Sequence, residues 1–308
     1  PARKRPGTRF VAEVKDSADA TRLLPFEYST TQAYVLEFGD LYIRFYLDGG
    51  VVESSPGVPY EIVSPYTSAQ LAALEYAQSA DVIYITHPDH PPYKLARASA
   101  LSWTITAVTF AWPPFNDENV GTTTLTASAV TGNITLTASA SLFVSADVGS
   151  YFKISEVSAS KYNQWTTGVS ITSGDIVYYL GNIYQSGTTA AAGSRPPIHT
   201  SGTESDGAVS WTFLHDGAGY AQITAYTSAT LVNATVIKRL PATALTGSTR
   251  WAEGAWSARR GYPHAVTFYE DRLWFAGSTS KPQTLWASVS GDYENHKYGT
   301  NDDDALNY

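Results

Sequence analysis

Apolar and polar residues alternate with a period of two along most of this chain. The clearest example is "QAYVLEFGDLYIRFYLDGGVV" at 32–52, where aromatic and β-branched residues dominate and glycine or aspartate interrupts the run at 39–40 and 48–50. Glycine and aspartate supply the backbone freedom that tight turns between paired strands require. The stretch therefore predicts an antiparallel meander whose aromatic side chains pack in a core.

One segment departs from this alternation. In "YTSAQLAALEYAQSA" at 66–80, Leu71, Leu74 and Gln78 follow a period near 3.6, and Thr67 with Gln70 fits a capping box. We predict one short helix here, after which "DVIYI" returns to a strand.

Two low-charge stretches follow. The first contains "TLTASA" at 124–129 and again at 135–140, which predicts paired strands of a small β-domain, because a repeat array needs at least three units. The second, at 163–217, contains the strands "DIVYYL" and "NIYQS", joined through Gly181-Asn182, and then a long Gly-, Ser- and Thr-rich loop at 186–208.

Alternation resumes at 219–241 and again in "HAVTFYEDRLWFAGSTSKPQTLWASVSGDYENH", where turn signals separate three short strands. Such spacing favours a propeller blade or a sandwich sheet. We therefore expect an all-β fold with a propeller-like main domain, inserted small β-domains and one short helix.

These changes in composition divide the chain into five segments. They are 1–118, the first part of a propeller-like or platform domain; 119–157, a small inserted β-domain; 158–217, an inserted β-module; 218–249, a β return segment; and 250–308, a further blade. The sequence has no methionine, even at position 1. We expect it to be a piece of a longer polypeptide.

Composition excludes several classes of function. Only 16% of the 308 residues are charged and the net charge is −8, which argues against a protein that holds nucleic acid by neutralising phosphates. The absence of cysteine excludes disulfides, thiolate metal sites and thiol catalysis. No apolar run approaches the ~18 residues that a membrane-spanning helix needs, so we expect no membrane-spanning segment.

The most conspicuous polar motif is the H-x-x-H of "DVIYITHPDHPPYKL". Paired histidines of a zinc site favour positions i and i+4 on a helix, or further cysteine and histidine ligands. Prolines around His87 and His90 forbid a helix, and the other histidines show no ligand spacing. We interpret the motif as a rigid turn that ends a strand, and not as a metal site.

No residue pattern indicates catalysis. There is no G-x-S-x-G, and serine and threonine are too abundant for any triad to stand out. The run Asp302, Asp303 and Asp304 lacks the alternating ligands and following glutamate of a calcium loop, so we expect a solvated loop. We predict that the chain is not an enzyme and uses no cofactor or metal.

The aromatic residues of 163–217 suggest a binding function. The arrangement "W…SGDIVYYLGNIYQS…PP…W" resembles the small chitin-binding modules of chitinases, which carry flanking aromatic residues. If exposed, Trp165, Tyr184 and Trp211 would stack on sugar rings and make a glycan contact. The alternative is that these rings form a miniature core, since so small a domain needs its aromatic residues inside.

A second resemblance involves blocks at both ends of the chain. "RPGTRFVAEVK", "RLLPFEYSTTQAYVLEFGDLYIRFYLDGG", "PYEIVSPYTSAQLAALEYAQSADVIYITHPDHPPYKLAR" and the C-terminal block quoted above resemble the tail nozzle proteins of short-tailed bacteriophages, also called tail tubular protein B, and their prophage relatives. The blocks cover about 1–115 and 250–298. The intervening insert at 120–245 departs from the family.

The resemblance implies an all-β, propeller-based structural protein of the virion tail. Six copies would form a ring that is attached to an adaptor ring, neighbours the tail fibres, and continues the channel through which genomic DNA passes during ejection. The family offers no catalytic residues to carry over. The alternative function is a carbohydrate-binding adhesin or tail-fibre-like protein that holds the host surface.

Overall fold

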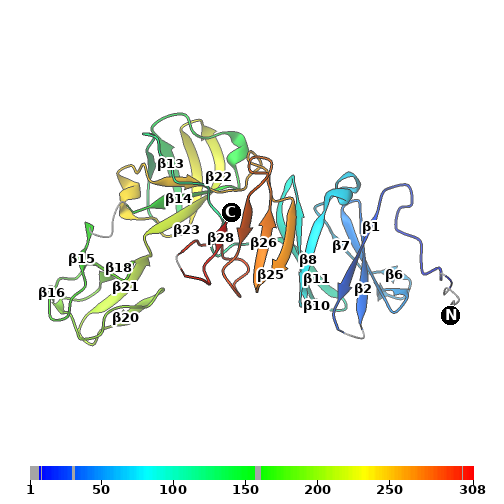
Figure 1. The fold of residues 1–308 in the computed structure, drawn as a ribbon, viewed down its shortest axis with the longest axis horizontal. Helices are drawn as coiled ribbons and strands as arrows, with labels where there is room; N and C mark the ends of the chain where they lie inside the picture. The colour runs from blue at the N-terminus through cyan, green and yellow to red at the C-terminus, as the bar shows by residue number, and fades with distance from the viewer. Residues whose placement is uncertain (1–6, 8, 30–31, 157–160, 300) are drawn as a thin grey trace. The chain divides into compact units, whose positions relative to one another are not determined.

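The computed structural model describes residues 7, 9–29, 32–156, 161–299 and 301–308 (Figure 1). It is nearly all β, with 48% of residues in strands and 5% in helices, and it includes a sheet that curls into a half-barrel. The predicted all-β class is confirmed. A half-barrel with several small sheets is a coarser description than a propeller, so the propeller stays a prediction.

The chain folds as two compact units. The first unit combines 1–113 with 260–308, and the second unit is the continuous segment 114–259. In the colouring of Figure 1, the first unit is blue to cyan together with orange to red, and the second is green to yellow.

The first unit contains three main sheets. The first sheet has the order β1-β2-β3-β4, with β7 also paired to β3; the second has the order β11-β10-β9-β8; the third has the order β25-β26-β27-β28. Their bounds are β1 Arg22–Glu27, β2 Ala33–Gly39, β3 Tyr42–Leu47, β4 Gly50–Val51, β7 Glu61–Val63, β8 Glu75–Ser79, β9 Val82–His87, β10 His90–Ser99, β11 Ser102–Ala107, β25 Ala265–Tyr269, β26 Arg272–Ala276, β27 Leu285–Ala287 and β28 Leu306–Asn307. A small hairpin joins β5 Glu53–Ser55 to β6 Val58–Pro59.

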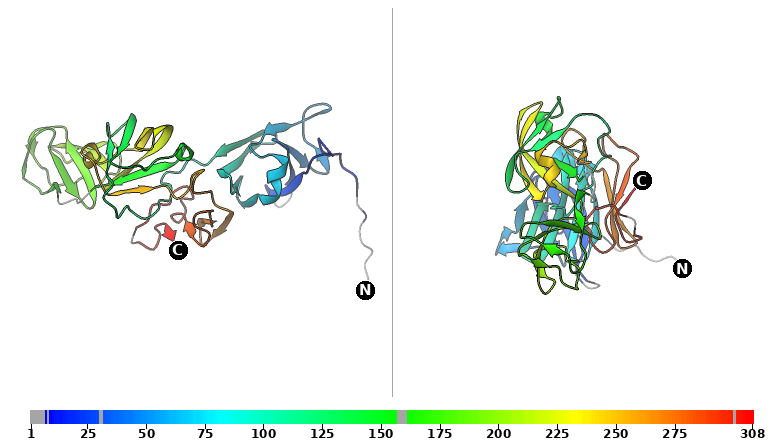
Figure 2. Two further views of the ribbon diagram at one scale, coloured as in Figure 1. Left: turned by 90° about the horizontal axis from the view of Figure 1, so that it is seen from above. Right: turned by 90° about the vertical axis from the view of Figure 1, so that its left-hand side faces the viewer.

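The first two sheets pack face to face, as the two directions of view in Figures 1 and 2 show. Alternate residues of β2 and β3 point inward, so that Leu36, Phe38, Ile43 and Phe45 are fully buried. The ring of Trp103, from β11, lies 4.6 Å from the ring of Phe45 and completes this core. The predicted meander is confirmed, because β2, β3 and β4 are consecutive antiparallel neighbours.

The helix expected over 66–80 is much shorter in the structure. A 3₁₀-helix, η1, covers only Ser68–Ala73, and its start is capped as predicted, with Thr67 N–H donating to Gln70 Oε1 at 3.0 Å. From residue 75 the chain is strand β8, which pairs along its whole length with β9. The helical prediction is wrong beyond residue 73, because pairing with a buried strand outweighs weak helix propensity.

The second unit is built on a six-stranded sheet with the order β12-β13-β23-β22-β14-β24. The strands are β12 Leu125–Ala127, β13 Asn133–Ala138, β14 Tyr151–Ser155, β22 Ala218–Ser228, β23 Leu231–Lys238 and β24 Trp251–Glu253, with the 3₁₀-helices η2 Ser145–Asp147 and η4 Ala242–Leu245. The two "TLTASA" copies form β12 and β13, which pair as predicted. Strands on both sides of 163–217 therefore share one sheet and one core.

The segment 163–215, which we call the module, has its own small sheets between β14 and β22. Its strands are β15 Asn163–Gln164, β16 Ser170–Ile171, β17 Ile176–Tyr179, β18 Asn182–Ser186, β19 Ala190–Ala191, β20 Thr203–Ser205 and β21 Ser210–His215. The predicted β17–β18 hairpin is confirmed, although its turn uses Leu180 and Gly181, both with positive φ. The expected loop at 186–208 instead contains β19 and β20, because their backbones pair with β16 and β21.

Candidate functional site

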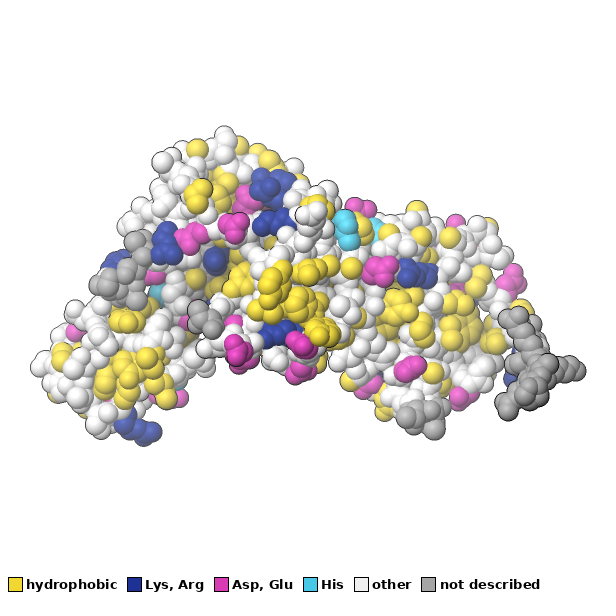
Figure 3. All heavy atoms as spheres, viewed as in Figure 1, with side chains coloured by type: hydrophobic (Ala, Val, Ile, Leu, Met, Phe, Trp, Pro, Cys, Tyr) yellow, Lys and Arg dark blue, Asp and Glu magenta, His cyan; other side chains and the backbone are white. Residues whose placement is uncertain are grey.

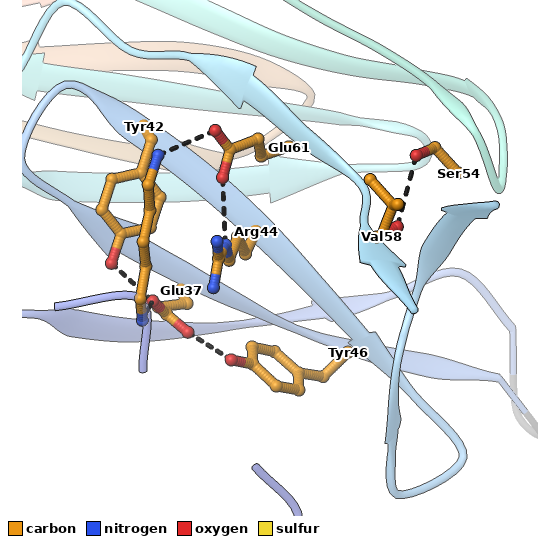
Figure 4. A network of polar contacts seen from close by, with 8 residues as sticks. Glu37, Tyr42, Arg44, Tyr46, Ser54, Val58 and Glu61 are labelled. Atoms are coloured by element: carbon orange, nitrogen blue, oxygen red, sulfur yellow. Dashed lines mark hydrogen bonds and ion pairs between the residues drawn. The ribbon is translucent and has the colours of Figure 1, made fainter. Parts of the chain in front are cut away.

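A buried carboxylate organises the outer face of the first sheet (Figure 4). Glu37 lies on β2, between two inward-facing residues, so its side chain points away from the core, yet it is fully buried. Its Oε1 accepts hydrogen bonds from the Tyr42 hydroxyl at 2.6 Å and the Lys15 backbone N–H at 3.0 Å, and its Oε2 accepts one from the Tyr46 hydroxyl. Antiparallel register places Arg44 directly opposite Glu37.

Opposite charges extend this network to the edge of the sheet. Glu61, on β7, contacts Lys15 Nζ at 2.8 Å and Arg44 Nε at 3.0 Å (Figure 4). Burial alone would raise the pKa of Glu61, but hydrogen bonds from the two cations outweigh it and lower the pKa. Burial and then the hydrogen bonds to Glu37 raise the pKa values of Tyr42 and Tyr46, so both hydroxyls stay protonated donors.

The same face carries a pocket of about 310 Å³ between the extended chain near Val11 and the first sheet. Apolar side chains that include Val14, Leu23 and Val35 line it, and Glu37 lies at its wall. Both oxygens of Glu37 already accept hydrogen bonds from within the protein. The arrangement fastens the segment around Lys15 onto the sheet, which is a structural role.

The H-x-x-H motif forms the turn between β9 and β10. His87 ends one strand and His90 begins the next; their rings lie 5.3 Å apart, and His87 Nδ1 accepts the Asp89 backbone N–H at 3.1 Å. His90 Nε2 lies 3.1 Å from Gln70 Oε1. The predicted turn is confirmed, although β10 begins at His90 and thus includes both following prolines, at a bulge.

The three candidate glycan-stacking residues lie in the core of the module. Tyr184 is fully buried, Trp211 is 1% exposed and Trp165 is 8% exposed, and all three belong to one apolar cluster with Val177 and Val209. No ring face is therefore free to stack on a sugar. The structure agrees with the alternative, a miniature core, for the reason given from the sequence: so small a domain has few other large side chains to bury.

Asp206, which sequence reasoning missed, holds the module's long loop. Its Oδ1 accepts the backbone N–H groups of Ala208 and Val209 at 3.0 and 2.7 Å. Its Oδ2 accepts the backbone N–H of Gly193 at 2.8 Å and the indole N–H of Trp211 at 2.9 Å. Burial alone would raise its pKa, but these four hydrogen bonds outweigh it and lower the pKa. The turn signal "SDG" could have identified the two local bonds, although not the two distant ones.

The acidic run 302–304 interacts with the rest of the first unit through its backbone carbonyl groups. The buried guanidinium of Arg272 donates to the carbonyl oxygens of Asp302 and Asp304, each at 2.6 Å, and to that of Ser288 at 2.7 Å. The run is therefore not merely a solvated loop, since its backbone closes the third sheet of the first unit around a buried cation.

The described residues contain no cluster of three or more histidine, aspartate or glutamate side chains that could hold a metal ion. Across the described part of the chain, no helix is long and apolar enough to cross a membrane. No protein-family model matches the sequence, and no curated protein matches it.

Proposed function

We propose that this chain is a structural subunit of a bacteriophage tail nozzle, a non-enzymatic protein of the virion tail that assembles into a ring, in keeping with the hexamer that the family resemblance implies. The ring would attach to an adaptor ring, neighbour the tail fibres and continue the channel through which genomic DNA leaves. In this proposal, the second unit, 114–259, contains the insert at 120–245 by which the chain departs from the family.

One observation carries the proposal. The sequence blocks that resemble nozzle proteins, about 1–115 and 250–298, are far apart in the chain, yet they coincide closely with the two segments of the first unit, 1–113 and 260–308. A chance resemblance has no reason to follow the boundary of a discontinuous folding unit. The match thus supports one ancestral domain that was interrupted by an insert.

Specific contacts join the two blocks. Glu294 accepts hydrogen bonds from Lys94 Nζ at 2.6 Å and from the Tyr84 hydroxyl at 3.2 Å. The H-x-x-H turn takes part as well, because the carbonyl of Pro88 accepts the Tyr262 N–H at 3.2 Å. The N-terminal and C-terminal blocks of resemblance are therefore in direct contact within the first unit.

The charge distribution is compatible with a DNA conduit. On the face drawn in Figure 3, lysine and arginine side chains are scattered among acidic ones and form no large patch of one sign. The net charge is −8. A conduit benefits from such a surface, because strong phosphate contacts would retard the passage of DNA.

Electron microscopy of the full-length protein tests the proposal. Negatively stained particles should be rings with six-fold symmetry, and sedimentation of the same preparation should show a species of about six chains. A species that remains monomeric at high protein concentration would contradict it.

The alternative function, a carbohydrate-binding adhesin, was suggested by aromatic rings that would be exposed. Trp165, Tyr184 and Trp211 are buried, so these rings do not support it. We therefore do not propose glycan stacking on these rings.

A further inference from the structure

The outer side of the third sheet, on β25 to β28, is apolar and aromatic. Alternate residues of this sheet point inward, where Leu273, Phe275 and Trp286 are buried. The residues between them point outward, and of these Tyr269 is 62% exposed and Tyr308 is 70% exposed. Figure 3 shows hydrophobic side chains gathered over these strands. Single apolar residues are normal on a surface, whereas a contiguous group of them marks a contact site.

The exposed rings are held in place by contacts with one another. The ring of Trp274 lies parallel to the ring of Tyr308, with centroids 6.4 Å apart. The Trp274 indole N–H donates to the Tyr269 carbonyl oxygen at 3.1 Å, which fixes the indole at the end of β25. Leu285, which is 41% exposed, pairs with Tyr308 through two backbone hydrogen bonds. We call these four residues the aromatic face. Ordered side chains lose little entropy when a partner covers them.

Negative charge borders the aromatic face at one end. Glu270 and Asp271 form the turn between β25 and β26, and both are exposed. Asp302 and Asp303 lie beside this turn, because their backbone carbonyls accept hydrogen bonds from Arg272, on the same side of β26 as the indole. Within the described part of the chain, none of these four carboxylates forms an ion pair. Four carboxylates beside one buried guanidinium make this end attractive to cations.

The N-terminal segment of the same sequence has the complementary chemistry. Residues 1–10 read "PARKRPGTRF", with four cations and no acidic residue. Residues 1–6 and 8 lie outside the described residues. Phe10 is 80% exposed, so its ring has little contact with its own chain. Because cations pair with carboxylates and also lie over aromatic rings, the segment can make both kinds of contact that the aromatic face and its acidic end offer.

The segment is poorly placed to reach the aromatic face of its own chain. Lys15 holds it on the outer side of the first sheet, whose inner side packs on the second sheet. The third sheet contacts the opposite side of the second sheet, through Phe268 and Tyr84. Sheets pack about 10 Å apart, so about 30 Å separates the segment from the third sheet. Residues 3–9 span only about 20 Å when fully extended, so a second copy is the better donor.

We propose that the aromatic face binds residues 1–10 of a second copy of this chain, with the cations toward the acidic end and the Phe10 ring against Trp274 and Tyr308. The segment and the face are different surfaces, so the contact is head-to-tail and can close into a ring. The inference rests on the proposed function, since a ring of copies needs such a contact, and it adds which residues make it.

Fluorescence anisotropy of a labelled peptide of residues 1–10 tests the contact. The receiving protein is the full chain with Arg3→Gln, Lys4→Gln, Arg5→Gln and Arg9→Gln, so that its own segment does not compete for the face. The peptide should bind, and its affinity should fall as salt rises, because exposed ion pairs are screened. A peptide with glutamine in place of all four cations should bind about tenfold more weakly.

Variants of the receiving protein locate the site. Glu270→Gln with Asp303→Asn removes two exposed charges and should weaken peptide binding about fivefold. Glu27→Gln with Glu75→Gln makes the same change in net charge at exposed positions of the first unit and should leave the affinity unchanged. Tyr308→Ala changes a side chain that is 70% exposed, so the fold should persist while the affinity falls about fivefold.

Three results would overturn the proposal: no binding of the peptide, equal binding of the peptide without cations, or equal affinities for the two double variants. The assay does not depend on assembly. Rings of the unmodified protein without peptide binding would contradict this contact and leave the nozzle proposal standing. Peptide binding to a chain that never forms rings would do the reverse.

Discussion

Glu37 in the first unit and Asp206 in the second are both buried carboxylates that accept several hydrogen bonds, but they connect different parts of the chain. Asp206 bonds to three backbone N–H groups and one indole, all between residues 193 and 211. Glu37 bonds to two tyrosine hydroxyls of the neighbouring strand and to one backbone N–H of a segment 22 residues away.

This difference separates two uses of a buried charge. Asp206 replaces regular pairing where the backbone has no strand partner, so the loop conformation itself depends on it. Glu37 lies on a strand whose backbone is already paired with β1 and β3, so it fixes what lies over the sheet and not the sheet. Removing each carboxylate should therefore have different consequences, which can be measured.

The largest effect is expected for Asp206→Ala. Three backbone N–H groups and the Trp211 indole would lose their acceptor, and the module should lose about 4 kcal/mol of stability, which is large for so small a core. Urea unfolding followed by tryptophan fluorescence should show an early transition that the wild type lacks.

A matched variant checks this interpretation. Asp175 also accepts a backbone N–H in the module, from Thr172 at 2.7 Å, but through one bond in an exposed turn. Asp175→Ala should cost only about 1 kcal/mol. Equal losses for the two variants would mean that the loop does not depend on the Asp206 carboxylate.

A smaller and more local effect is expected for Glu37→Gln. The amide keeps the shape but loses the charge that strengthens three hydrogen bonds, at a cost of about 1–2 kcal/mol. Hydrogen exchange at the Lys15 amide should accelerate, while amides of β2 and β3 should keep their protection. Acceleration throughout β2 would show instead that Glu37 supports the sheet.

The smallest effects are expected from pH, and the two clusters should respond at opposite ends of the scale. The pKa of Asp206 is lowered in the folded protein, so its contribution is present above the unfolded pKa of about 4 and is lost as pH falls through the folded pKa. Asp206→Asn should flatten the acid side of a plot of the module's urea midpoint against pH.

The tyrosines around Glu37 act in the opposite sense. Burial and the bonds to Glu37 raise the pKa values of Tyr42 and Tyr46, so their contribution is present below the unfolded pKa of about 10 and is lost as pH rises above it. Tyr46→Phe should weaken the loss of stability of the first unit in alkali. An unchanged alkaline limb would show that Tyr46 ionises equally easily when folded.

Local pairing was predictable from the sequence, because turn residues and alternation are local signals. The β2–β3 and β17–β18 hairpins and the turn at His87 all follow from residues within about ten positions. The residue at which η1 ends was not predictable from these local signals, because β8 is fixed by its pairing with β9 and not by its own composition.

Neither buried carboxylate could be identified from the sequence. Glu37 stands at a position where alternation predicts a solvent-facing residue, and it is enclosed by the Tyr42 and Tyr46 side chains and the segment around Lys15. The aromatic face is equally hidden, because it joins residues 269–274 to residues 285 and 308 through strand pairing across long loops. Burial of Trp165, Tyr184 and Trp211 was one of two open alternatives, which sequence alone could not separate.

The pairing of β14 with β22 has a consequence for how such a protein could change over evolutionary time. The last register pair before the module is Ser155 with Ala218, and Glu156 N–H donates to the Gly217 carbonyl at 2.7 Å. The chain thus leaves and re-enters the six-stranded sheet at adjacent positions, as it would for a simple hairpin turn. The module could therefore be replaced at this junction by another domain, or by a few residues, without a change in the register of the six-stranded sheet.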